Sequence, residues 1–138
     1  MINIHGSCLS YYNKGILILG KSGTGKSDLC LRMIMNKGAK LVADDRVDIY
    51  VSGRDLKGRA VSTIAGLLEV RGIGLAKFDY QRSAKIALVV ELAKSRAEVE
   101  RMPEPEYFEH EGVKVRKIKL YPFDISAPDK IILALSQK

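Results

Sequence analysis

The sequence lacks tryptophan altogether and contains only two cysteines and four prolines among its 138 residues. The cysteines, Cys8 and Cys30, fall within a predicted strand and a predicted helix, where a thiol behaves as a small apolar side chain. So few cysteines do not indicate a metal site, and we expect both to be buried thiols in a reducing compartment.

Long hydrophobic runs are also absent. No stretch approaches the 18 apolar residues of a membrane-spanning helix, and residues 1–5 contain neither a basic segment nor the apolar core of a secretory signal. Low-complexity segments and internal repeats are missing as well. We therefore expect a cytoplasmic protein with no membrane partner.

The composition that remains is that of an ordinary globular domain. Apolar residues make up 46% and charged residues 28%, and the length fits a single domain over residues 1–138. The formal net charge of +7 raises the question of nucleic-acid binding. The basic residues are nevertheless spread along the chain, and the densest run, residues 114–119, has no interleaved aromatics. We expect a solvated basic strand face and no nucleic-acid partner.

One motif organises the chain. It follows the apolar run of residues 15–19 and reads Gly20-Lys21-Ser22-Gly23-Thr24-Gly25-Lys26-Ser27. This pattern is typical of a phosphate-binding loop between a strand and a helix: its glycines turn the backbone N–H groups toward phosphate, its lysine reaches the β and γ phosphates, and its serine can ligate Mg²⁺. A tight strand-to-helix turn alone would not require the Lys-Ser pair.

The remaining pattern predicts more strands than helices. Strands are expected over residues 2–12, 16–19, 40–43, 47–51, 60–64, 67–70, 86–92 and 113–120, and helices from the phosphate loop to Gly38 and over residues 126–136. Residues 93–109 are predicted to form an exposed segment and are a candidate for mobility. Because several strands follow one another without a helix, we predict a mixed α/β fold with a mixed sheet.

Acidic residues complete the candidate site. Asp44 and Asp45 end a short buried strand one helix and one turn after Lys26, so strand geometry can return them beside the loop. Asp44 is the candidate proton acceptor, although the pair could instead cap a turn or bind a structural cation. Glu69 and Arg71 are predicted to share a strand face, where Glu69 could bind a metal and Arg71 could contact phosphate. The pattern alone does not decide between these roles and that of ordinary strand residues. A single histidine such as His5 is more often structural than catalytic.

Three blocks together carry a family resemblance: residues 20–28, residues 41–47 (Leu-Val-Ala-Asp-Asp-Arg-Val) and residues 69–74 (Glu-Val-Arg-Gly-Ile-Gly), with His5-Gly6 upstream. In order and spacing they resemble the catalytic domain of HPr kinase/phosphorylase, from His5 to the closing helix. The resemblance implies a phosphate-loop nucleotide-binding fold of the kind found in phosphoenolpyruvate carboxykinase.

The same resemblance implies an activity and a set of roles. It implies an ATP- and Mg²⁺-dependent kinase that phosphorylates a serine of the phosphocarrier protein HPr, in many members with phosphorolytic dephosphorylation, in a homo-oligomer that is hexameric in the family. The implied catalytic residues are His5, Lys26, Asp44 and Arg101, the implied Mg²⁺ ligands are Ser27 and Glu69, and the supporting residues are Asp45 and Arg71. The match at Arg101 is looser, because the residues around it diverge.

Two departures from the family limit what the resemblance implies. The chain begins a few residues before His5, as in the short form without an N-terminal domain, and residues 126–130 read Ser-Ala-Pro-Asp-Lys where the family has an arginine-containing loop. We therefore predict weak or absent phosphorolysis. Two other functions stay open: a small-molecule kinase or NTPase, and a nucleotide-sensing module without turnover.

Overall fold

The computed structural model describes residues 1–61 and 65–137, which form a mixed α/β fold. The strands are β1 (Ile2–Tyr11), β2 (Lys14–Leu19), β3 (Lys40–Ala43), β4 (Arg46–Ser52), β5 (Asp55–Ala60), β6 (Leu67–Val70), β7 (Gly74–Lys77), β8 (Ser83–Leu92), β9 (Glu106–His110) and β10 (Val113–Leu120). The helices are α1 (Lys26–Lys37), the short 3₁₀ helix η2 (Arg96–Glu98) and α2 (Ala127–Ser136).

The main sheet closes on itself. In the described part of the chain it has eight strands in the order β2-β1-β4-β5-β8-β10-β9, with β3 paired to β1 and a further pairing of β2 with β8. The β2–β8 and β8–β10 pairs are parallel, whereas the remaining pairs of this sheet are antiparallel. The predicted mixed sheet is therefore confirmed.

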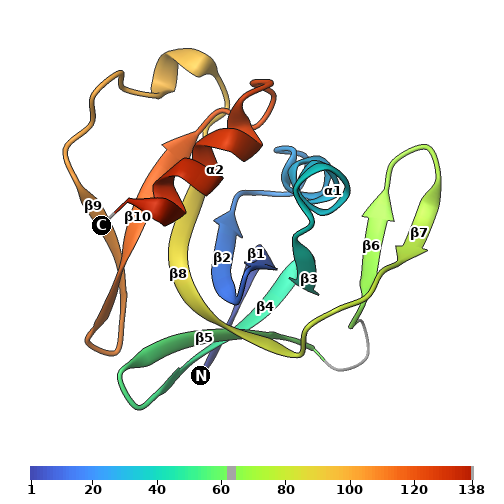
Figure 1. Ribbon diagram of the computed structural model, residues 1–138, viewed down its shortest axis with the longest axis horizontal. Helices are drawn as coiled ribbons and strands as arrows, with labels where there is room; N and C mark the ends of the chain where they lie inside the picture. The colour runs from blue at the N-terminus through green and yellow to red at the C-terminus, as the bar shows by residue number, and fades with distance from the viewer. Residues whose placement is uncertain (62–64, 138) are drawn as a thin grey trace.

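Alternate residues of the central strands feed two separate hydrophobic clusters. On β2, Ile16 and Ile18 pack toward the helices, whereas Leu17 packs inside the curved sheet, and all three are fully buried. Figure 1 shows α1 and α2 on the same side of the sheet, with the β6–β7 hairpin beyond α1. A strand that is apolar on both faces requires such burial on both sides, which explains the continuous apolar run before the loop.

The predicted and observed elements differ between residues 55 and 110. Strand β5 ends at Ala60, so the strand expected over 60–64 shares only Ala60 with it, and residues 62–64 lie outside the described residues. Strand β7 was not predicted. The segment over 93–109 is mostly exposed, as predicted, but it contains the unpredicted η2 and β9. Glu98 orders the start of this segment, because its carboxylate accepts hydrogen bonds from the backbone N–H groups of Lys94 and Ser95, at 2.6 and 3.1 Å.

Strand β5 was missed because its sequence, Asp-Leu-Lys-Gly-Arg-Ala, has low strand propensity. Gly58 pairs with β4 on one side and β8 on the other, and a Cβ there would come within 3.4 Å of Ile86, Val47 and Cys8. A glycine at this position lets the strands approach closely. Among the described residues, none of the helices has the length and apolar character needed to cross a membrane.

Candidate active site

The phosphate-loop motif forms the turn between β2 and α1. Gly23 and Gly25 have φ values of 83° and 102°, in the left-handed region that favours glycine. The Thr24 hydroxyl donates to the Lys21 carbonyl at 2.6 Å and fixes the turn. A Cβ on Gly25 would also come within 2.9 Å of the Phe123 ring. Conformation and space therefore both require glycine at this point of the loop.

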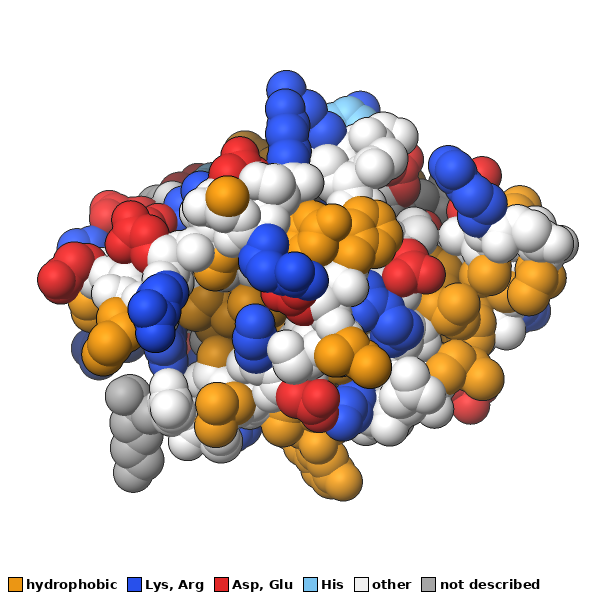
Figure 2. Space-filling model, turned by 90° about the horizontal axis from the view of Figure 1, so that it is seen from above, with side chains coloured by type: hydrophobic (Ala, Val, Ile, Leu, Met, Phe, Trp, Pro, Cys, Tyr) orange, Lys and Arg blue, Asp and Glu red, His pale blue; other side chains and the backbone are white. Residues whose placement is uncertain are grey.

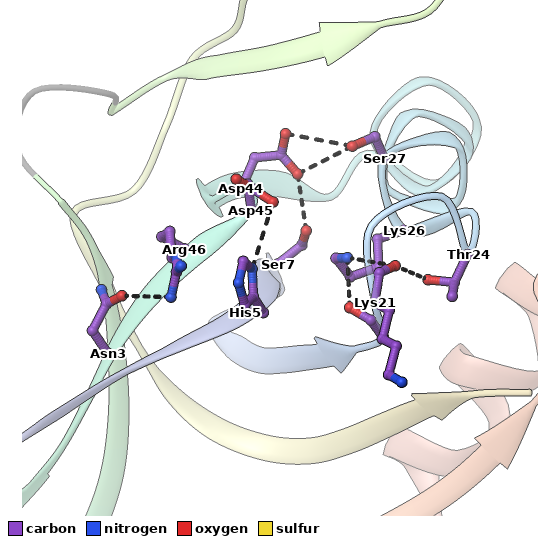
Figure 3. Close-up of polar contacts among 11 residues, drawn as sticks. Asn3, His5, Ser7, Lys21, Thr24, Lys26, Ser27, Asp44, Asp45 and Arg46 are labelled. Atoms are coloured by element: carbon purple, nitrogen blue, oxygen red, sulfur yellow. Dashed lines mark hydrogen bonds and ion pairs between the residues drawn. The ribbon is translucent and has the colours of Figure 1, made fainter.

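Lys26 is the first residue of α1 and is almost fully buried. Its ammonium donates to the carbonyl oxygens of Gly20 and Lys21, at 2.6 and 3.1 Å. The side chain thus folds back across the loop, as Figure 3 shows. A buried lysine needs such partners, because an unpaired ammonium away from water is costly. The Lys26 ammonium therefore lies at the phosphate loop itself.

The tight turn between β3 and β4 separates the two adjacent aspartates. Asp45 has φ 66°, and the N–H of Arg46 bonds to the Asp44 carbonyl across it at 2.7 Å. Aspartate tolerates this conformation better than most residues. As a result Asp44 faces Ser7 and Ser27, whereas Asp45 faces His5 (Figure 3). The two carboxylates therefore have different surroundings, although they are neighbours in sequence.

Asp44 lies at the centre of the polar contacts beside the loop. Its Oδ1 accepts a hydrogen bond from the Ser7 hydroxyl at 2.9 Å, and the Ser27 hydroxyl lies 3.3 and 3.4 Å from its two oxygens. Burial raises the pKa of this carboxyl; the two serines and the Glu69 backbone N–H oppose that rise, and the Asp45 charge adds to it. A partly desolvated carboxylate near a phosphate loop is suited to accept a proton.

His5 pairs with the second aspartate, not with the first. Its Nδ1 lies 4.0 Å from Asp45 Oδ1, and both side chains are more than half exposed. This arrangement places a histidine at the edge of the site, on the same strand as Ser7. The resemblance had implied that His5 is the catalytic neighbour of Asp44, and the structure brings it to the adjacent carboxylate.

A cavity of about 780 Å³ joins the loop, the aspartates and the β6–β7 hairpin. Glu69 and Arg71 both line it, as does Phe123 from the connection between β10 and α2. The full lining is Ser22, Gly23, Gly25, Lys26, Ser27, Asp28, Leu31, Asp44, Asp45, Glu69, Val70, Arg71, Gly72, Gly74 and Phe123. Most of the predicted site residues therefore surround one cavity. Sequence motifs far apart in the chain meet here.

Five predicted site residues do not line this cavity: His5, Gly20, Lys21, Thr24 and Arg101. His5, Gly20 and Lys21 line a second pocket together with Ser22, whereas Arg101 lines neither pocket. Arg101 is exposed in the connection between η2 and β9. Conversely, sequence reasoning missed Ser7 and Phe123. Strand alternation could have found Ser7, because it lies two residues after His5 and so shares its face. Phe123 carries no such signal, because only the fold brings residues 121–125 to the loop.

The charged side chains of the surface are mixed in sign. Figure 2 shows Lys and Arg scattered among acidic and apolar side chains on the face viewed. On β10, Lys117 lies 3.4 Å from Glu91 and 3.5 Å from Glu106, and Lys119 lies 3.4 Å from Glu91. The densest basic run of the sequence is therefore balanced by neighbouring carboxylates. This balance agrees with a solvated strand face.

The fold and the cavity define a mixed α/β domain whose glycine-rich loop lies beside a carboxylate-bearing strand turn. Residues 1–124 match the family described as HPr Serine kinase C-terminal domain. The chain belongs to this family.

Individual relatives agree with the family match. The chain is 38% identical over 129 residues to the HPr kinase/phosphorylase of Cupriavidus necator, covering 86% of this chain and 40% of that relative. It is 35% identical over 135 residues to the one from Caldanaerobacter subterraneus subsp. tengcongensis, covering 92% and 41%. The chain thus spans about 40% of the length of these curated relatives.

A solved structure shows the same fold. The structure of the Hpr(Ser) kinase/phosphatase from Coxiella burnetii aligns with a TM-score of 0.80 and 24% sequence identity, over 98% of this chain and 93% of that chain. Its likeness bears on the fold alone, and it supports the mixed sheet described above.

Proposed function

We propose that this domain is a kinase that transfers the γ-phosphoryl group of ATP to a serine of an HPr-type phosphocarrier protein. The observation that carries the proposal is the contact of Asp44 with Ser27, at 3.3 Å, beside the phosphate loop. This contact supports the proposal, because it brings the carboxylate that would accept the proton next to the residue that would hold the metal. Membership of the HPr kinase family supports HPr as the acceptor protein.

The residues around the cavity suit a Mg²⁺–nucleotide substrate. Among residues 1–61 and 65–137, no group of three or more His, Cys, Asp and Glu could hold a metal by itself. Magnesium is usually bound by one or two protein oxygens together with substrate phosphates, and Ser27 and Glu69 provide such oxygens on the same cavity. When bound, the ion neutralises charge on the transferring phosphoryl group. Loop N–H groups and Lys26 would hold the phosphates.

The proposed reaction is an in-line displacement at the γ-phosphorus of ATP. The serine hydroxyl oxygen of the acceptor forms a bond to the γ-phosphorus while the bond from that phosphorus to the bridging oxygen breaks. Asp44 accepts the hydroxyl proton, and ADP leaves with the electron pair of the broken bond. Arg71, which lines the cavity, is placed to pair with phosphate oxygens.

A transfer assay tests this proposal. Purified protein is incubated with Mg²⁺, labelled ATP and HPr from the same organism, beside an HPr variant whose regulatory serine is replaced by alanine. We expect label on the wild-type carrier only. ATP binding without label on either carrier would contradict the proposal and favour a small-molecule kinase, an NTPase or a sensing module, which a panel of acceptors and an ATP hydrolysis assay would separate.

We further propose that phosphorolysis is weak or absent. Residues 126–130, which form the N-cap and first turn of α2, contain no arginine. Lys130 in this segment and Arg96 outside it are both paired with Asp124, at 3.6 and 2.5 Å. Both cations are therefore already in ion pairs with Asp124. Incubation of serine-phosphorylated HPr with excess phosphate is expected to release little pyrophosphate, and rapid release would overturn the proposal.

The family resemblance also favours a cytoplasmic homo-oligomer. Light scattering of the purified protein at micromolar concentration is expected to give a multiple of the 15.3 kDa chain mass. A mass equal to one chain would contradict this expectation.

A further inference from the structure

Ser7 is a fully buried serine behind the site. Ser7 lies on β1 with no exposed surface and is followed by Cys8 and Leu9, which are equally buried. A hydroxyl in such surroundings must find a partner within the protein. Its partner is a carboxylate 37 residues away in the sequence: the Ser7 hydroxyl donates to Asp44 Oδ1 at 2.9 Å.

The chemistry of the two groups determines which of them donates. An ionised carboxylate oxygen can only accept a hydrogen bond, so at 2.9 Å the Ser7 hydroxyl is the donor and Asp44 Oδ1 the acceptor. A hydrogen bond to a charged acceptor is stronger than one between neutral groups. The Ser7 hydroxyl therefore directs its proton to Asp44 Oδ1.

We infer that Ser7 is a positioning residue for Asp44, because its hydroxyl holds the carboxylate in the orientation that faces Ser27 and the cavity. This inference rests on the proposed function, in which Asp44 accepts the proton of the attacking hydroxyl. Figure 3 shows the carboxylate between Ser7 on one side and Ser27 on the other. Ser27 comes from α1 and Ser7 from the sheet, so the two hydroxyls fix Asp44 between the helix and the strand.

The central test compares Ser7→Ala with wild type in the HPr transfer assay. Alanine removes the hydroxyl and little volume, so we expect kcat to fall about 10-fold, as when a supporting hydrogen bond to a site residue is lost. The KM for ATP and the Kd for ATP should stay within about 2-fold of wild type, because Ser7 does not line the cavity. Ser7→Thr keeps the hydroxyl and should restore kcat.

The strand offers a matched control. Ser10 is also buried, at 3% exposure, and by strand alternation it lies on the opposite face of β1. Ser10→Ala removes the same hydroxyl from the same strand and should leave kcat unchanged. Thermal unfolding of all variants separates loss of kcat from loss of folded protein. If Ser7→Ala fails to fold, Ser7→Cys, a much weaker hydrogen-bond donor of similar shape, must lose kcat where Ser7→Thr keeps it.

A double-mutant cycle decides whether Ser7 acts through Asp44. In the Asp44→Asn background, Ser7→Ala should cause no further 10-fold loss, and an equal loss in both backgrounds would overturn the inference. Ser7→Ala with wild-type kcat would overturn it as well. Wild-type protein that transfers no phosphate to HPr would instead refute the proposed function itself, so the two failures are distinguishable.

Discussion

The two sides of the cavity are built differently. On one side, Lys26 and Asp44 lie at the ends of elements of the main sheet and its covering helix, and their side chains are buried or half-buried. On the other, Glu69 lies on β6 of a separate two-stranded sheet, and Arg71 lies in the exposed turn that joins β6 to β7. The phosphate-loop side is therefore built from the main sheet and its helix, whereas the other side is a hairpin outside that sheet. The expectation that Glu69 and Arg71 share a strand face was wrong, because β6 ends at Val70.

The hairpin is nevertheless anchored at one strand. Leu68 is fully buried and Val70 is nearly so, both in the cluster that contains α1, whereas Leu75 on β7 is 72% exposed. Strand β6 thus fixes Glu69 between two anchored residues, and β7 adds little to the core. This difference predicts that substitutions on the loop side affect binding and chemistry strongly, while exposed hairpin substitutions affect stability little.

The largest effect is expected from Lys26→Ala. The ammonium is buried and bonded to two loop carbonyls, so its removal takes away both a phosphate contact and a support of the loop. We expect kcat/KM to fall about 10³-fold and ATP affinity to fall with it. Steady-state kinetics and calorimetric titration with ATP measure both quantities. Lys40→Ala, at an exposed lysine of β3, should change neither.

Asp44→Asn should act on the chemical step alone. We expect kcat to fall by at least about 10²-fold with nucleotide affinity little altered, because the amide keeps the shape but cannot accept the proton. Asp45→Asn is the matched control, since this neighbouring carboxylate faces His5 instead of Ser27. An equal loss of kcat in both variants would contradict the separate roles assigned to the two aspartates.

Glu69→Gln tests the hairpin side of the comparison. Loss of one carboxylate ligand should raise the Mg²⁺ concentration needed for half-maximal activity about 10-fold. The midpoint of thermal unfolding should stay the same, because Glu69 is exposed. Activity measured across a Mg²⁺ series, with and without the substitution, gives the shift. An unchanged Mg²⁺ dependence would remove Glu69 from the proposed ligands.

The smallest effect is expected from Leu75→Ala. Its side chain is mostly exposed, so the free energy of unfolding should change by less than about 0.5 kcal/mol. The matched substitution Leu17→Ala, at a fully buried leucine of β2, should cost about 2–5 kcal/mol. Denaturant unfolding of the two variants measures the difference. A large cost at Leu75 would show that the hairpin is part of the core after all.

The strand pattern shows where sequence reasoning succeeds. Buried strands such as β2 and β8 were predicted because both faces are apolar, and α1 was predicted because a glycine-rich loop precedes it and Gly38, with φ 74°, ends it. Strands β5, β7 and β9 were missed, because their residues are polar or exposed and lack a clear apolar alternation. Each of them pairs with a strand that is its neighbour in the chain, so distance in sequence is not the reason.

The sequence by itself determined the phosphate-loop turn, the mixed α/β class and the arrival of an aspartate pair at a strand end, because local spacing and strand alternation are written in the chain. Only the tertiary structure decided that Asp44 meets Ser7 and Ser27 while Asp45 meets His5. It also decided that Phe123 reaches the loop and that Arg101 lies away from the cavity. Such contacts follow from the packing of distant elements, which the spacing of residues along the chain does not encode.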